Sequence, residues 1–290
     1  MAANPVKVLC DSCADLPLPT LRQYNIHSIP LTVSFGNESF KDGVDITAEG
    51  FYQRLRTAAS MPTTSQVTPA EYMQFFGPLT ADGADLVYVS LSSGLSGSYQ
   101  SAVAAASAEP FRDRVHVVDS LGASIGLGLM VLQAAELAAE GRSAAEIVND
   151  ITAYRGRMCH VFTLDTLEYA RRGGRVSAFS AIAANVLDVK PVLHMDMAGK
   201  LIPIDRVRGR KRSINRLFEE MERLGANVMD KRVGISHAQC EEEAAEAAHR
   251  FRTKYSAREV VVGQIGATIG AHVGPGCLSI FFEGPDGRGA

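Results

Sequence analysis

The segment "LVYVSLSSGLSGSYQSAVAAASA", residues 86–108, decides the fold class, because it joins an apolar run to a serine- and glycine-rich loop and then to an alanine-rich stretch. A continuous apolar run such as residues 86–89 is typical of a strand buried on both faces of a sheet. The small residues from 97 to 108 predict a helix. A strand, a loop and a helix in this order form one unit of a parallel α/β sheet.

The same order of strand and helix repeats through the N-terminal half of the chain. Apolar runs predict the strands, and apolar side chains at helical spacing predict the helices between them. Ser143 and Glu146 fit a capping box at the start of one helix. We therefore expect strands at residues 6–10, 26–35, 86–91, 115–118 and 160–164, and helices at residues 48–58, from 69 onward, 97–108, 124–140 and 143–154.

The pattern changes after residue 164. Residues 189–207 form two extended segments around a turn at Ala198-Gly199, which predicts an antiparallel hairpin. Helices at 210–224 and 241–254 then alternate with strands at 232–238, 259–266 and 277–284. We therefore predict an α/β protein of two domains. Residues 1–165 form an N-terminal Rossmann-like parallel sheet with flanking helices, and residues 166–290 form a C-terminal mixed-sheet α/β domain.

The composition indicates a globular chain and argues against two classes of protein. Of the 290 residues, 46% are hydrophobic, which permits a large core. The net charge of -3 gives no electrostatic reason to expect nucleic-acid binding. No apolar window reaches the roughly 18 residues of a membrane span. The basic run Arg206–Arg212 is the exception to this balance and a candidate partner surface.

The cysteines do not indicate a disulfide framework, because there are five of them, an odd number, and the N-terminus lacks a secretory pattern. Cys10 and Cys13 form a C-x-x-C pair near a strand end, without the surrounding residues of a redox motif. No other Cys/His grouping has the spacing of a metal site. We expect a cytoplasmic protein with no metal and no cofactor.

The serine-rich loop at residues 90–101 lies where a helix begins, and a helix N-terminus attracts anions. It lacks the G-x-S-x-G pattern of a nucleophile elbow and the motifs of phosphate loops. Two interpretations remain open. The hydroxyls and amides hold a carboxylate, or they only cap and pack the helix.

Three further segments carry polar groups that suit a ligand. The loop "PTTSQ", residues 62–66, is hydroxyl-rich and would meet the first loop if both lie at the carboxyl edge of one sheet. His272 stands in the glycine-rich segment 266–276, and Arg175 follows two glycines. Each also has a plain structural interpretation, as a helix cap, a turn histidine or a solvated charge.

Ten segments, spread over nearly the whole chain, form an ordered set: "CDSCADLP", "PLTV", "KDGVDI", "TSQVTPAEY", "SSGLSGSYQSA", "VVDS", "LEYARRGGRVS", "VKPVL", "GKLIPIDRVRG" and "GAHVGPG". Together, and in this order, they resemble the DegV family. The resemblance implies a two-domain α/β protein that binds one long-chain fatty acid in an apolar tunnel between its domains. It also implies a subunit of a bacterial fatty acid kinase that presents the carboxylate to a separate dihydroxyacetone-kinase-like ATP-binding protein, which makes the acyl phosphate.

The resemblance also assigns roles to residues, none of them catalytic. Thr64 and Ser93 are the expected direct contacts of the carboxylate, and His272 is expected to serve both the head group and the incoming phosphate. Arg175 and Arg208 are expected to contact the kinase or the phosphate. The full set expected around the carboxylate is Thr64, Ser65, Ser93, Ser96, Gly97 and His272.

Several alternatives remain. A Ser/His lipid or ester hydrolase would use Ser93 or Ser96 with His272, and a structural protein would bind lipid only adventitiously. Transient contact with a membrane surface would permit lipid exchange. Helices at residues 51–55, 72–76 and 125–132 are candidates for the wall of the tunnel or for ordinary core.

Overall fold

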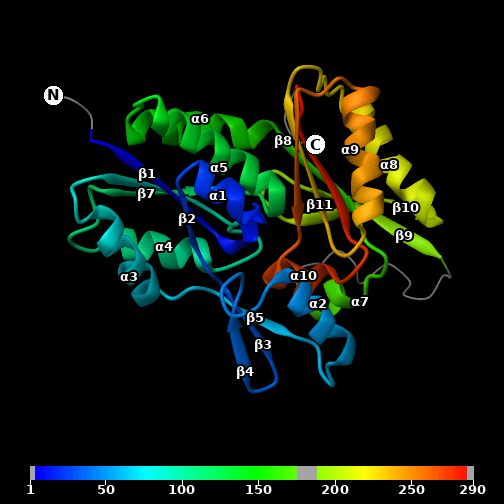
Figure 1. Ribbon diagram of the computed structural model, residues 1–290, viewed down its shortest axis with the longest axis horizontal. Coiled ribbons are helices and arrows are strands. Elements are labelled where there is room, and N and C mark those ends of the chain that lie inside the picture. Colours follow the sequence, from blue (N-terminus) through cyan, green and yellow to red (C-terminus); the bar gives the residue numbers. More distant parts are fainter. Residues whose placement is uncertain (1–3, 175–187, 286–290) are drawn as a thin grey trace.

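Two sheets of different construction form the frame of the protein in the computed structural model, which describes residues 4–174 and 188–285 (Figure 1). One is a four-stranded sheet and the other a six-stranded sheet; a small three-stranded sheet lies beside them. No helix among the described residues is both long and apolar enough to cross a membrane.

The four-stranded sheet is entirely parallel, which confirms the Rossmann-like prediction. Helices cover both of its faces, as continuous apolar strands require. Its strands, in spatial order, are β2 (Ile26–Ile29), β1 (Val6–Asp11), β6 (Asp85–Ser90) and β7 (Val115–Asp119). The helices are α5 (Ser124–Ala139) and α6 (Ala144–Arg157) on one face, with α3 (Pro69–Thr80) and α4 (Ser98–Ala106) on the other.

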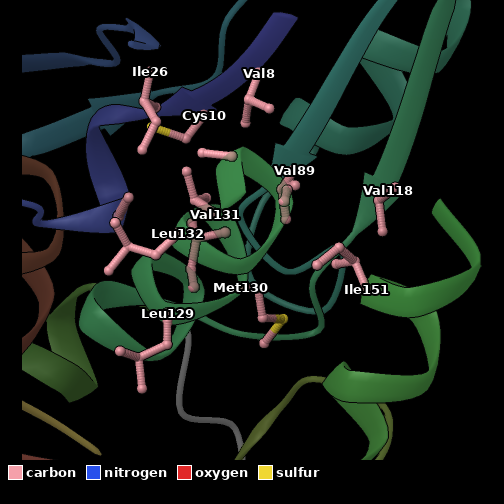
Figure 2. Packing of buried hydrophobic residues seen from close by; sticks show 14 of the residues in the cluster. Val8, Cys10, Ile26, Val89, Val118, Leu129, Met130, Val131, Leu132 and Ile151 are labelled. Atoms are coloured by element: carbon pink, nitrogen blue, oxygen red, sulfur yellow. The ribbon is translucent and has the colours of Figure 1, made fainter. Parts of the chain in front are cut away.

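Side chains that alternate along each strand supply the two cores. Val8 and Val89 belong to one buried cluster with Leu129 and Met130 of α5 (Figure 2). Tyr88, which precedes Val89 in β6, belongs instead to the cluster on the α3 and α4 side. Helix α5 is apolar around nearly its whole circumference because it also packs against the second sheet. The capping box of Ser143 at the start of α6 is confirmed.

The six-stranded sheet is mixed, which confirms the prediction for the C-terminal half. The predicted hairpin turns at Gly199, whose φ of 69° suits glycine. In spatial order the strands are β10 (Leu201–Arg208), β9 (Val189–Met195), β8 (Met158–Thr163), β13 (Leu278–Glu283), β11 (Arg232–His237) and β12 (Glu259–Gln264). Helices α8 (Arg210–Arg223) and α9 (Glu241–Thr253) cover one face.

A cluster of short elements closes one end of the molecule (Figure 1). Its elements are β3 (Thr32–Phe35), β4 (Glu38–Lys41), β5 (Thr63–Ser65), α2 (Ala48–Thr57), α7 (Glu168–Arg172) and α10 (Ala267–Val273). Two more short helices, η1 (Ser12–Ala14) and α1 (Leu18–Gln23), follow β1.

The structure corrects two predictions. The expected single strand at residues 26–35 is divided between two sheets, because Pro30 lacks the N–H that would continue the ladder. The strand expected at residues 160–164 of the parallel sheet is β8, which instead pairs antiparallel with β13 and β9 of the mixed sheet. The division into domains 1–165 and 166–290 stays a prediction.

Candidate functional site

A cavity of about 420 Å³ lies between the loops of the parallel sheet and the open face of the mixed sheet. This volume falls within the range of roughly 300–1,000 Å³ that is usual for small-molecule sites. Leu31, Leu91 and Leu95 line it from the N-terminal half, and Met195 and Leu201 line it from the hairpin of β9 and β10. The cavity is therefore walled by both halves of the chain.

The alternation of side chains in β8 and β13 divides them between the cavity and the core on the opposite face of the mixed sheet. Phe162 of β8 and Phe281 of β13 line the cavity, whereas Val161 and Ile280 pack on the opposite face under α8 and α9. The predicted wall helices at 51–55, 72–76 and 125–132 are ordinary core, since none of their residues lines the cavity.

Hydroxyl groups and one imidazole gather at one part of the lining. Thr64 Oγ1 and His272 Nε2 lie 2.9 Å apart, at hydrogen-bonding distance. Strand β5 holds Thr64 by pairing it with Val33, and the last turn of α10 carries His272. Gly173 packs against the ring so closely that a Cβ there would lie 2.2 Å from His272 Nδ1, so only glycine fits.

The segment that leads into α4 adds Ser96 and Gly97 to the lining, next to Gln66. Ser96 Oγ accepts a hydrogen bond from the Ser98 N–H at 3.1 Å and donates to Ser98 Oγ at 3.0 Å. Gly97 is the N-cap residue of α4 and has no side chain that could cap the helix. It packs closely against the side chain of Gln66. The serine-rich loop therefore brings a helix N-terminus to the cavity, and its role in ligand binding stays a prediction.

The structure brings together five of the predicted residues: Thr64, Ser65, Ser96, Gly97 and His272. Ser93 is not on the cavity lining; its N–H donates to Asp119 Oδ1 at 3.1 Å, and its direct contact with a ligand stays a prediction. Its neighbour Ser92 ties the loop to the hairpin by donating to the Gly199 carbonyl at 2.8 Å.

One of the two predicted arginines lies apart from this cluster. Arg208 is exposed at the end of β10 and lines a separate surface groove with Arg206 and Arg212. Arg175 lies outside the described residues. The hydrolase hypothesis uses Ser93 or Ser96 with His272; a hydroxyl that the described residues place at hydrogen-bonding distance from His272 Nε2 is that of Thr64.

Three buried carboxyl groups beside the cavity were missed by sequence reasoning. Asp42 accepts hydrogen bonds from the N–H groups of Ala267 and Thr268, at 3.0 and 2.9 Å, and so caps α10. Asp15 accepts from the Gly266 N–H at 2.8 Å, and burial raises its pKa well above the usual range. These groups satisfy N–H groups at the start of α10, and Thr268, Ile269, His272 and Val273 of this helix line the cavity.

The third carboxyl group belongs to Asp11 and fixes the strand ends. Asp11 Oδ1 accepts from the Cys13 N–H at 3.0 Å, and Oδ2 accepts from the Leu91 N–H at 2.8 Å. Burial raises its pKa to about 6. In the sequence, Asp11 and Asp15 lie in "CDSCADLP" and Asp42 lies in "KDGVDI". Both segments contributed to the family resemblance, but neither predicted a structural or binding role for these carboxyl groups.

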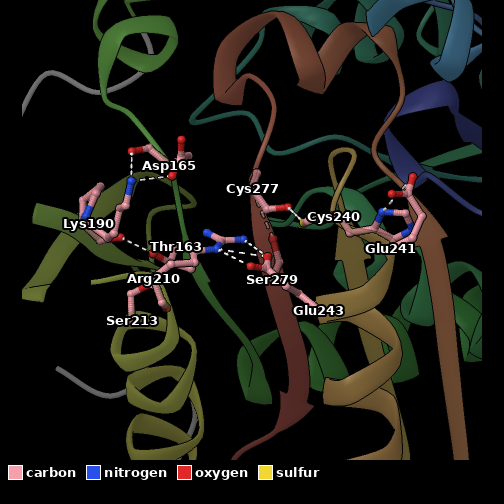
Figure 3. A network of polar contacts seen from close by, with 12 residues as sticks. Thr163, Asp165, Lys190, Arg210, Ser213, Cys240, Glu241, Glu243, Cys277 and Ser279 are labelled. Carbon is pink, nitrogen blue, oxygen red and sulfur yellow. Dashed lines mark hydrogen bonds and ion pairs between the residues drawn. The ribbon is translucent and has the colours of Figure 1, made fainter. Parts of the chain in front are cut away.

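A second polar network ties the ends of the mixed sheet to its helices (Figure 3). Arg210 of α8 donates to both carboxylate oxygens of Glu243 in α9. Cys240 Sγ lies 3.3 Å from the carbonyl oxygen of Cys277, a cavity residue. Within residues 4–174 and 188–285, no group of three or more Cys, His, Asp or Glu side chains has the arrangement of a metal site.

Comparison with known proteins gives a consistent result. The model of the DegV family of uncharacterised proteins matches residues 5–284. A DegV domain-containing protein of Caldanaerobacter subterraneus subsp. tengcongensis is 36% identical over 278 residues, covering 96% of this chain and 98% of the relative.

Two solved structures have the same fold over nearly their whole length. DegV of Bacillus subtilis, described as a fatty acid binding protein, is 32% identical, with a TM-score of 0.86 over 97% of this chain and 100% of its own. A fatty-acid-binding DegV family protein of Thermus thermophilus is 29% identical, with a TM-score of 0.89 over 97% and 99% of the two chains. This chain belongs to the DegV family.

Proposed function

We propose that the protein binds one long-chain fatty acid in the cavity between its two sheets and presents the carboxylate to a partner kinase. The observation that carries this proposal is the layout of the cavity. Nine leucine, isoleucine, phenylalanine and methionine side chains line it, and Thr64, Ser65 and Ser96 lie with His272 at one part of it, while Ser124, His160, Thr268 and Ser279 add further polar groups to the lining. An acyl chain with a single polar end has the matching distribution of groups.

The energetics of burial favour such a ligand. Burying a chain of ~14 methylenes at ~0.8 kcal/mol each contributes about 11 kcal/mol before the cost of association. That free energy is sufficient for tight binding without a buried ion pair at the head group. The fatty-acid-binding proteins of Bacillus subtilis and Thermus thermophilus, which have this fold, support the same ligand class.

Neutral donors at the head group suit a ligand that has to react later. The hydroxyls of Thr64 and Ser65 and the imidazole of His272 can satisfy carboxylate lone pairs without the strong pairing of an arginine. Phosphoryl transfer needs ATP, Mg²⁺ and a phosphate-binding loop. The sequence contains no such loop, so we assign these parts to a dihydroxyacetone-kinase-like partner.

The surface groove at the end of β10 is the proposed contact for that kinase. Arg206, Arg208 and Arg212 line it, and their three guanidinium groups form no ion pair within the described residues. Unpaired arginines suit an acidic protein surface or a phosphate. We place this exchange in the cytoplasm, where the kinase and ATP would be found.

Native mass spectrometry of the purified protein, followed by denaturing extraction, tests the proposal. The expected result is one fatty acid per chain, recovered intact from the extract. A protein that is purified empty and also takes up no added fatty acid would contradict the proposal. Release of an alcohol and an acid from added p-nitrophenyl esters, lost in Ser96→Ala, would instead favour the hydrolase.

A further inference from the structure

The short helix that carries His272 packs against the small three-stranded sheet that carries Thr64. Helix α10 has seven residues, so it is about 10 Å long. It packs against β3 and β5, and β4 and β5 form the two edges of this sheet. Because neighbouring strands lie ~4.8 Å apart, β4 and β5 are also separated by about 10 Å. The helix therefore matches the width of the sheet.

The start of α10 is held by a carboxylate at the end of β4. Asp42 follows directly after β4, and its two oxygens accept hydrogen bonds from the Ala267 N–H at 3.0 Å and the Thr268 N–H at 2.9 Å. The N-cap residue of α10 is Gly266, which has no side chain that could accept them. A residue 225 positions before Ala267 in the chain therefore supplies the cap.

The end of α10 is held at the opposite edge of the same sheet, where His272 Nε2 lies 2.9 Å from Thr64 Oγ1 of β5. Between its two ends the helix lies close to α2. A Cβ added at Gly270 would be 2.8 Å from the Tyr52 hydroxyl oxygen, and this hydroxyl donates to the Ile265 carbonyl at 3.1 Å. Close packing on this side leaves α10 no room to move toward α2.

One row of paired residues connects the two ends. Thr32 of β3 pairs with Lys41 of β4 and with Ser65 of β5. Asp42 is the neighbour of Lys41, and Thr64 is the neighbour of Ser65. The backbone ladder thus fixes the spacing between the carboxylate at one end of α10 and the hydroxyl at the other. A helix of seven residues is not stable by itself, so its position depends on these contacts.

We propose that Asp42 is a positioning residue for the head group of the bound fatty acid. It is not among the residues that line the cavity, and it acts through α10. Its carboxylate anchors the start of the helix, and the helix places His272 beside Thr64. This inference rests on the proposed fatty-acid ligand. Without the anchor, α10 loses two hydrogen bonds, and the imidazole no longer keeps its distance from the Thr64 hydroxyl.

The variant Asp42→Ala tests this role when two ligands of equal chain length are compared. Palmitate carries a carboxylate, whereas hexadecane has no head group. Partition of each radiolabelled ligand between the protein and phosphatidylcholine vesicles measures its affinity. In Asp42→Ala the affinity for palmitate should fall about tenfold, the factor that matches the loss of a helix cap, whereas the affinity for hexadecane should change less than about twofold. Asp45→Ala is the matched control, because Asp45 is exposed in the same turn and accepts from the Lys41 N–H at 2.8 Å.

A second comparison removes the histidine. If Asp42 acts through His272, Asp42→Ala should change palmitate affinity by less than about twofold in a protein that already carries His272→Ala. Circular dichroism confirms that each variant is folded. If Asp42→Ala does not fold, Gly270→Ala takes its place, because the added Cβ meets the Tyr52 hydroxyl and pushes α10 away from α2. Gly270→Ala should likewise weaken palmitate binding and spare hexadecane binding.

The outcomes separate this inference from the proposed function. Unchanged palmitate affinity in Asp42→Ala, or an equal loss of palmitate and hexadecane binding, would overturn the positioning role and leave fatty-acid binding intact. The same holds if Asp42→Ala costs as much affinity beside His272→Ala as it does alone. Failure of the wild-type protein to bind palmitate would remove the proposed function together with this inference.

Discussion

Replacing Thr64 by valine removes one hydroxyl from the head-group region and keeps the shape of the side chain. Thr64 Oγ1 lies 2.9 Å from His272 Nε2 and lines the cavity, so the change removes both the proposed ligand contact and the support of the imidazole. A hydrogen bond to a charged group contributes ~1.5–3 kcal/mol. The dissociation constant for a fatty acid should therefore rise by roughly 10- to 150-fold.

Thr63→Val is the matched control, because Thr63 is the preceding residue of the same strand, is exposed and is not on the cavity lining. Displacement of a fluorescent fatty acid measures the dissociation constants of both variants. Circular dichroism and urea unfolding confirm that each is folded. A Thr64→Val protein that binds as tightly as Thr63→Val would refute the assignment of Thr64 to the head group.

Three further predictions concern the buried acid, the loop packing and the arginine groove. Because burial raises the pKa of Asp11 to about 6 from 3.8, its protonated form is favoured in the folded state; stability is therefore highest below the unfolded pKa and falls as pH rises through 6. This one group should lower the free energy of unfolding by about 1.4 kcal/mol between pH 5 and pH 8. Urea titrations should show that loss to be smaller in Asp11→Asn, and curves parallel to wild type would contradict the burial argument. In Gly94→Ala the new Cβ would lie 2.6 Å from the Ala198 carbonyl oxygen, so unfolding should cost ~1–3 kcal/mol less. Gly77→Ala, which meets nothing within 4 Å, should not destabilise, and equal urea midpoints for the two variants would refute the contact. Arg208→Ala should retain fatty acid yet slow acyl-phosphate formation with the kinase and ATP, whereas equal loss of both would contradict its role as a docking residue.

The layered fold could be predicted because its signals are local. Continuous apolar runs such as residues 86–89 can only be buried strands when helices flank them in sequence. The capping box at Ser143 and the turn at Gly199 act through neighbouring residues, and both are confirmed. Two predictions were wrong where one residue or one pairing overrides the pattern: Pro30 divides an extended segment, and β8 joins the mixed sheet.

The candidate site could be predicted only in part, because the direction of a loop side chain depends on distant contacts. Among the serines of one loop, Ser92 bonds to Gly199 and Ser96 lines the cavity, while Ser93 does neither. The orientation follows from the packing of Gly94 against the hairpin, which no local pattern encodes. The walls were missed for the same reason, since Phe162 and Phe281 face the cavity only after the two sheets meet.

A crystal structure with a fatty acid that carries bromine at its tail tests the proposed binding mode most directly. We predict a carboxylate beside Thr64 and His272, and an anomalous bromine peak among apolar lining side chains such as Phe162 and Phe281. Electron density for the lipid only on the outer surface, with the cavity left without it at saturating ligand, would contradict binding between the two sheets.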